Sequence, residues 1–109
     1  MKIYSSSLRE ECEVFGVAVS FSDSWPTEKR VVFYVEDKGA RGLCVEELGG
    51  AKILDGSLSV NFKIHFFANM DGLIFLWDYF DDLNHLSKLM DFDPETVADF
   101  EKARASFSV

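Results

Sequence analysis

The sequence predicts an α+β fold: an antiparallel β-meander of about four to five strands, with two C-terminal helices packed on one face. Two patterns predict it. Across 58–66, apolar residues alternate with polar ones, which is the period of a strand with one dry and one wet face. From residue 82 onward, apolar residues instead recur every three or four positions, which is the period of an amphipathic helix.

We expect one globular domain over residues 1–109. A chain of 109 residues falls within the usual size of a single hydrophobic core. Its hydrophobic fraction of 48% and its aromatic fraction of 15% are too high for an intrinsically disordered chain.

The N-terminal part of the chain carries two competing signals. The segment Ser7 to Glu10 fits a capping box, in which the Ser7 hydroxyl and the Glu10 carboxylate would cap a helix reciprocally. The competing signal is the alternation of apolar with smaller or polar residues over 12–21, which is typical of a strand. We favour a short N-terminal helix to about Phe15, followed by a strand.

The next segments have the composition of loops and strands. Residues 22–30 are polar and predict a loop, whereas 31–35 are β-branched and aromatic and predict a strand. Turn-forming residues at 37–39 then lead to a further predicted strand over 41–47.

Asp-Gly pairs at 55–56 and 71–72 flank the alternating segment 58–66 and suit successive hairpins. The apolar run 73–80 is therefore expected to be a strand paired with 58–66. A short apolar run does not declare its period, so a helix over 71–90 remains the alternative.

The C-terminal region predicts two helices. The leucine spacing indicates a first helix over at least 82–90. The second has a clear start, with Asp93 as N-cap, Pro94 at the first helical position and Glu95 in the first turn, where the helix dipole favours an anion.

The charge distribution is the strongest functional signal. The chain has 19 acidic and 11 basic side chains, which gives a formal net charge of −8. Residues 71–101 hold nine acids and one lysine, so this segment carries a charge equal to that of the whole chain. Excess negative charge disfavours direct binding to nucleic acid and to anionic membranes, because both depend on Lys and Arg to neutralise phosphate.

Two interpretations of this segment remain open. In one, its acids only solvate the helices and complement their N-termini. In the other, they form a docking surface for a basic protein, with aromatic anchors among them. The residues predicted to bind that partner are Trp77, Asp78, Tyr79, Asp81, Asp82, Asp91 and Asp93.

The docking interpretation predicts a class of function. A compact acidic domain can occlude the cationic groove of a nuclease, which is the work of an immunity protein or antitoxin. We therefore expect a small inhibitor that blocks a basic partner, either a toxin or another nucleic-acid-binding protein. The alternative is a phage-type mimic of nucleic acid that acts against CRISPR or restriction defences. Self-association through the many aromatic residues is a further alternative.

No catalytic, cofactor-binding or metal-binding residues are predicted. The sequence has no glycine-rich phosphate loop and no nucleophile elbow. Asp91, Asp93 and Glu95 offer oxygen ligands but lack the glycine and the final glutamate of a calcium loop. A small enzyme or ligand-binding domain, with a pocket between sheet and helices and using His65 or Cys44, is the less favoured class.

The sequence also predicts a location. Cys12 and Cys44 lie among apolar neighbours, so we expect buried thiols in a reducing compartment. The longest strongly apolar run has five residues, far short of the roughly 20 that cross a bilayer, and no secretory signal is recognisable. We therefore expect a soluble cytoplasmic protein.

Overall fold

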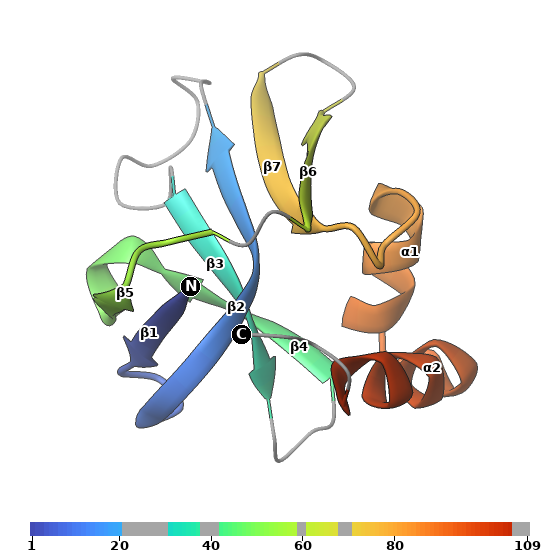
Figure 1. Ribbon diagram of the computed structural model, residues 1–109, viewed down its shortest axis with the longest axis horizontal. Coiled ribbons are helices and arrows are strands. Elements are labelled where there is room, and N and C mark those ends of the chain that lie inside the picture. Colours follow the sequence, from blue (N-terminus) through green and yellow to red (C-terminus); the bar gives the residue numbers. More distant parts are fainter. Residues whose placement is uncertain (21–30, 38–41, 59–60, 68–70, 106–109) are drawn as a thin grey trace.

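The computed structural model describes residues 1–20, 31–37, 42–58, 61–67 and 71–105 (Figure 1). It confirms the α+β class, with more strands than predicted. The strands are β1 (Lys2–Ser5), β2 (Glu10–Ser20), β3 (Val31–Asp37), β4 (Gly42–Glu47), β5 (Ala51–Asp55), β6 (Phe62–Phe66) and β7 (Gly72–Trp77). A 3-10 turn, η2 (Leu48–Gly50), precedes β5, and the helices are α1 (Leu83–Met90) and α2 (Pro94–Ala105).

The long strand β2 organises an antiparallel sheet that forks. On one side, β2 pairs with β3, and β3 pairs with β4. On the other side, residues 10–13 of β2 pair with β1, whereas residues 16–20 pair with β7. The two branches, β1 with β5 and β7 with β6, therefore diverge from opposite halves of one strand, and Figure 1 shows them spreading apart.

The core has two parts. The larger part lies where the helices pack against the sheet. It contains Phe15, Ala18, Leu43, Ile74, Leu76, Trp77, Phe80, Leu86, Leu89 and Phe100. The smaller part lies nearer β1 and contains Ile3, Cys12, Val14, Phe33 and Val35. The helices thus cover one region of the sheet, as predicted, and do not cover its whole surface.

The predicted N-terminal helix is wrong. Residues 6–9 form a turn, and β2 begins at Glu10, so the strand signal over 12–21 was the correct one as far as Ser20. Ser7 does not cap a helix, because its amide and hydroxyl both donate to the Glu46 carboxylate, at 3.1 Å each. The positive φ of Arg9, 56°, reverses the chain between β1 and β2.

Glu46, which lies near the end of β4, anchors that turn. Its carboxylate, only 4% exposed, also accepts hydrogen bonds from Ser5 Oγ at 2.7 Å and from Glu47 N at 3.1 Å. Burial alone would raise the pKa of Glu46, but the hydrogen bonds from Ser5, Ser7 and Glu47 outweigh it and hold the pKa below its usual value. Glu46 is therefore a structural carboxylate.

The hairpin predicted for 58–66 and 73–80 is present over a shorter length, with β6 paired to β7 and Ile64 opposite Phe75. The alternative helix over 71–90 is wrong, because α1 begins only at Leu83. Leu58 lies outside the strand, and residues 59–60 fall outside the described part of the chain.

The face of β6 that the alternation predicts to be dry is largely wet. Ile64 is 52% exposed and Phe66 is 54% exposed. The reason is topological: among the described residues β6 pairs only with β7, so it is an edge strand. Alternation reports which side chains share a face, but burial needs a covering layer as well.

The hairpin predicted at Asp55-Gly56 is wrong, because β5 pairs with β1 and β6 pairs with β7. Other predicted elements agree with the structure. The segments predicted as strands at 31–35 and 41–47 correspond to β3 and β4, and both helices lie where the spacing placed them. The predicted loop at 22–30 lies outside the described residues.

Candidate functional site

The N-terminus of α1 is fixed by its own side chains. Asp82 caps the helix, because its Oδ1 accepts a hydrogen bond from His85 N at 2.9 Å. His85 Nδ1 in turn accepts from the Asp81 amide at 3.2 Å. The His85 ring packs on Tyr79 and Phe80, with centroid separations of 5.1 and 5.2 Å. The loop between β7 and α1 is therefore held by both hydrogen bonds and ring contacts.

Aromatic rings form the support below this loop. Trp77 is 8% exposed and contacts Phe15 at 5.6 Å and Tyr79 at 4.9 Å between centroids. Trp77, a predicted anchor for the partner, is the last residue of β7 and belongs to the core where the helices pack. Tyr79 is half-buried. Burial raises the pKa of its phenol, and the charges of Asp99 and Asp81 raise it further, so the hydroxyl stays protonated at neutral pH.

A shallow groove of about 380 Å³ lies between α1 and α2. We call it the acidic groove, and it is lined by Asp81, Asp82, Asn84, His85, Lys88, Thr96 and Asp99. Two of the predicted partner-binding residues, Asp81 and Asp82, therefore lie together in it, and Tyr79 lies within the electrostatic influence of Asp81 and Asp99. Three carboxylates face one lysine across this groove.

Sequence reasoning missed Asp99. Its exposed carboxylate makes no hydrogen bond or ion pair with any described residue. The spacing of Thr96 and Asp99, three residues apart on a helix, does predict that they share a face. What the spacing does not predict is that this face of α2 lies beside the N-terminal turn of α1.

Other predicted residues lie elsewhere on the helical side. Asp93 is the N-terminal cap of α2 and accepts from Thr96 N at 3.1 Å and from Thr96 Oγ1 at 2.7 Å. These bonds hold the pKa of Asp93 below its usual value. Asp78 is exposed, and its amide donates to the Asn61 carbonyl at 2.7 Å.

Asp91 is unusual because it stands at the C-terminal end of α1. The helix dipole places partial negative charge at that end, so an exposed carboxylate there gains no dipole stabilisation. Helix capping thus accounts for Asp82 and Asp93. The Asp81 carboxylate has only a long contact with His85, whose Nδ1 lies 4.0 Å from its Oδ2, and Asp78, Asp91 and Asp99 cap no helix N-terminus.

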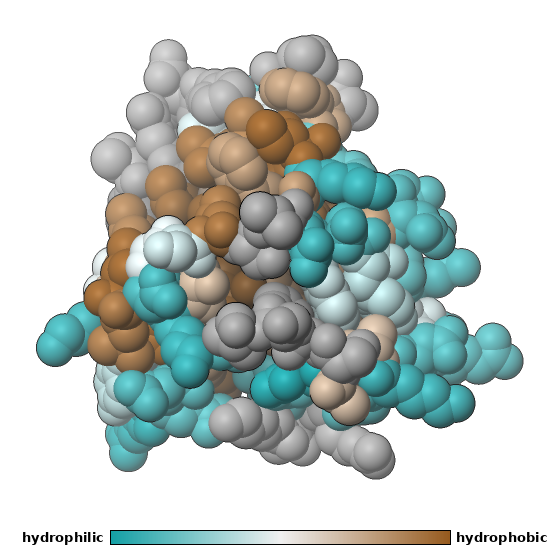
Figure 2. Space-filling model, in the orientation of Figure 1, coloured by the Kyte–Doolittle hydropathy of each residue, from teal (hydrophilic) through white to brown (hydrophobic). Residues whose placement is uncertain are grey.

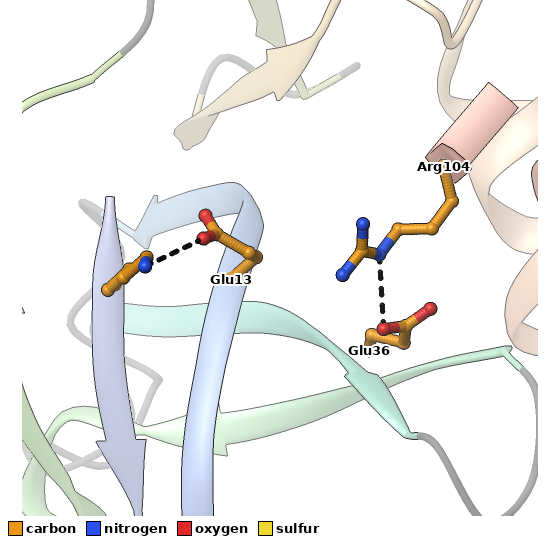
Figure 3. A network of polar contacts seen from close by, with 4 residues as sticks. Glu13, Glu36 and Arg104 are labelled. Atoms are coloured by element: carbon orange, nitrogen blue, oxygen red, sulfur yellow. Dashed lines mark hydrogen bonds and ion pairs between the residues drawn. The ribbon is translucent and has the colours of Figure 1, made fainter. Parts of the chain in front are cut away.

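A second hollow, of about 210 Å³, separates the sheet from the end of α2. Figure 3 shows its two ion pairs, one of Glu36 with Arg104 and one at Glu13. Arg104 Nε donates to Glu36 Oε1 at 3.1 Å, and Lys2 Nζ lies 3.6 Å from Glu13 Oε1. The Arg104 guanidinium also lies 5.8 Å above the Phe15 ring centre. Each cation here has an anion of its own. We assign the Arg104 contacts to fixing α2 on the sheet, and the Lys2–Glu13 pair to joining β1 and β2.

The residues considered for an enzymatic pocket do not converge. Cys44 is on β4 and His65 is on β6, with β3, β2 and β7 between those strands. Burial first, and then the charges of Asp37, Cys12, Glu46 and Glu10, raise the pKa of Cys44 to about 11, which keeps it a thiol at neutral pH. Among the described residues, no group of three or more His, Cys, Asp or Glu is placed to hold a metal ion.

Cys12 is buried and Cys44 is half-buried, and both are thiols. No helix in the described part of the chain is long and apolar enough to cross a membrane. Comparisons with protein-family models, with curated proteins and with solved structures find no match to this chain.

Proposed function

We propose that this protein is a binding module that docks its acidic groove on a basic protein and blocks it. The observation that carries the proposal is the groove between α1 and α2, where Asp81 and Asp99 stand exposed beside the capping residue Asp82. Acids needed only for solubility have no reason to gather beside a half-buried tyrosine on two packed helices.

The chemistry of the groove suits a lysine or arginine side chain of the partner. An incoming cation would meet the carboxylates of Asp81 and Asp99, which are not used as helix caps. The Tyr79 hydroxyl, protonated at neutral pH, adds a hydrogen-bonding group beside them, and the rigid aromatic support limits the entropy lost on binding.

Charge of this kind acts chiefly on association. A cationic partner is steered toward the acidic groove, which raises the association rate and makes it fall as salt increases. Groups on the far side of the molecule contribute little, since the screening length is about 8 Å at physiological ionic strength.

The class of protein that fits best is an immunity protein or antitoxin that neutralises a toxin such as a nuclease. A nuclease must carry a cationic groove to bind phosphate, so an acidic domain competes directly with its substrate. We place the protein in the cytoplasm, where thiols such as Cys12 and Cys44 stay reduced. A phage-type nucleic-acid mimic acting on a defence nuclease would use the same surface.

Reversal of the groove charge tests this function. The variant D81K/D99K changes the net charge from −8 to −4, and the control E11K/D55K makes the same change at exposed acids of β2 and β5. Each immobilised protein is exposed to a lysate of its host, captured proteins are identified by mass spectrometry, and the affinity of the purified partner is then measured.

We expect D81K/D99K to weaken the partner's affinity at least about tenfold, roughly 1.4 kcal/mol, while the control retains most of it. The captured protein should be basic, and its activity on nucleic acid should be inhibited by the unmodified chain. Equal losses in both variants would mean that net charge alone attracts the partner, and unchanged binding in both would exclude the acidic groove.

A further inference from the structure

Within the part of the chain that the structure describes, no strand pairs with the outer edge of β6. Phe67 N donates to Gly72 O at 3.0 Å, and Asp78 N donates to Asn61 O at 2.7 Å, just beyond the two ends of the β6–β7 ladder. Because backbone groups alternate in direction along an antiparallel strand, odd-numbered residues of this segment point their N–H and C=O groups toward β7. Phe62, Ile64 and Phe66 therefore point theirs away from it. We call these three residues the β6 edge.

The same three residues share the exposed apolar face of the hairpin. Ile64 and Phe66 are 52% and 54% exposed, and Phe62 is half-buried. Each therefore offers both unpaired backbone groups and apolar surface, which is the combination that natural edge strands avoid when they must remain single.

The apolar face continues inward as two rows that cross four strands. Opposite Ile64 lies Phe75, and then Val17 and Phe33 follow across β2 and β3. Exposure rises along this row, from 2% at Phe33 to 52% at Ile64. A parallel row runs through Phe66, Leu73, Val19 and Val31. Figure 2 shows hydrophobic residues gathered over the strands, whereas hydrophilic residues dominate over the helices.

The sequence of β6 is self-complementary. It reads Phe62-Lys63-Ile64-His65-Phe66, which has the same order of aromatic, basic and aliphatic residues in both directions. In an antiparallel pair centred on Ile64, the Phe62 of one copy lies opposite the Phe66 of the other. Aromatic pairs across neighbouring strands are among the favourable cross-strand contacts.

The strand β6 carries none of the chain's excess negative charge. The chain carries a net charge of −8, but β6 contains Lys63 and no acidic residue. The strand itself therefore brings no acidic side chain to an interface between two copies. The remaining repulsion between two acidic molecules acts at longer range and is weakened by salt.

We propose that two copies of this chain associate through the β6 edge, with β6 paired antiparallel to β6 of the second copy about a two-fold axis at Ile64. The interface is isologous, because each copy offers the same strand. Five residues of strand and a few apolar side chains make a small contact, so we expect a reversible dimer with a dissociation constant on the order of 10 to 100 µM. The dimer would present two acidic grooves and does not depend on what they bind.

A matched pair of variants tests the dimer. Ile64→Lys adds a charge at the β6 edge, and Ile53→Lys makes the same change on β5, where Ile53 is 51% exposed. Sedimentation velocity over a concentration series should show the unmodified chain and I53K forming dimers, with I64K weakened at least tenfold. Both positions are exposed, so circular dichroism should show folded protein in each case.

Cross-linking tests the register. In a pair centred on Ile64, the two Cα atoms at that position lie about 5.5 Å apart, within the range that a disulfide spans. Ile64→Cys should therefore form a disulfide-linked dimer under mild oxidation, and Ile53→Cys should not. The native thiols react slowly, since Cys12 is 3% exposed and the pKa of Cys44 is raised to about 11.

Three results would overturn the proposal. They are a monomer for the unmodified chain at every concentration up to about 1 mM, a dimer that I53K disrupts and I64K does not, and cross-linking of I53C in place of I64C. A monomer at every concentration would mean that the β6 edge does not pair with a second copy and is open to a strand of another protein. Either of the other two results would assign self-association to β5. None of these results bears on binding at the acidic groove, which D81K/D99K tests separately.

Discussion

The acidic groove and the β6 edge expose opposite kinds of side chain. In the groove, the Asp82 carboxylate caps α1, whereas the carboxylates of Asp81 and Asp99 cap no helix. On β6, Ile64 and Phe66 are exposed without covering the core. On both surfaces, the residues that neither cap a helix nor pack in the core are the ones that point to a partner.

The two surfaces should respond to salt in opposite directions. Added salt screens the attraction between the acidic groove and a cation, so partner binding weakens. It also screens the repulsion between two acidic copies, so association through β6 strengthens. A single protein with both responses would show that the two surfaces act independently.

The largest effect is expected from replacing a phenylalanine by alanine, either under the acidic groove or at the β6 edge. Phe100 is fully buried on α2 and contacts Phe15 at 5.4 Å between centroids, so Phe100→Ala should lower the free energy of unfolding by about 3–5 kcal/mol. It should weaken partner binding, because α2 carries Asp99, and spare self-association. Phe66 is 54% exposed, so Phe66→Ala should weaken self-association and spare partner binding, with little loss of stability. Denaturant unfolding and sedimentation measure both.

Two results would contradict this assignment of the two surfaces. If F100A destabilised the fold but left partner affinity unchanged, the groove would not be the binding surface. If F66A left the sedimentation of the protein unchanged, the β6 edge would have no part in association.

The next largest effect is a difference in stability between loss of the buried Glu46 carboxylate and loss of the exposed carboxylates of the acidic groove. Glu46→Ala removes the acceptor for Ser5, Ser7 and Glu47, so we expect a loss of about 2–3 kcal/mol in the free energy of unfolding. D81K/D99K should stay within about 0.5 kcal/mol of the unmodified chain. Comparable losses in the two variants would show that the groove acids also hold the fold together.

Glu46 also predicts a pH dependence. Its pKa is lowered in the folded state, so its contribution is fully present above the unfolded value of about 4.3 and is lost as pH falls through the folded pKa. Glu46→Gln cannot titrate, so the variant should be less stable at neutral pH and lose less stability on acidification. Thermal unfolding between about pH 7 and pH 3 measures both slopes, and parallel slopes would contradict the assignment.

The smallest effect is expected between two neighbouring residues of the acidic groove, Asp81 and Asp82. Asp82→Ala removes a helix cap and should cost about 1 kcal/mol, whereas Asp81→Ala should change stability by less than about 0.5 kcal/mol. Partner affinity should respond in the opposite order, with D81A the more harmful. Thermal unfolding together with partner titration checks this, and equal stability losses would mean that capping does not separate the two residues.

Local signals predicted much of this fold. The α+β class, the strands at 31–35 and 41–47 and the start of α2 at Pro94 depend on neighbouring residues, which the sequence displays directly. The capping box at Ser7 failed because its hydrogen bonds go to Glu46, 39 residues away. Contacts of such long range leave no mark in a local pattern.

The sequence predicted the negative charge of the candidate site, but only some of the residues that line it. The acidic segment and Asp81 with Asp82 were found by counting charge. The burial of Trp77 was not predicted, because an apolar run does not show which of its residues face the core. Asp99 was missed, because the neighbouring positions of two helices are set by packing. The exposed face of β6 depends equally on the absence of a covering layer over an edge strand, which alternation does not report.

The most direct test of the central claim is the affinity of the purified partner over a salt series from about 50 mM to about 500 mM, measured for the unmodified chain, D81K/D99K and I64K. We predict steep weakening with salt for the unmodified chain and I64K, and weak, nearly salt-independent binding for D81K/D99K. Binding that ignores salt, or that is lost in I64K and kept in D81K/D99K, would contradict docking through the acidic groove.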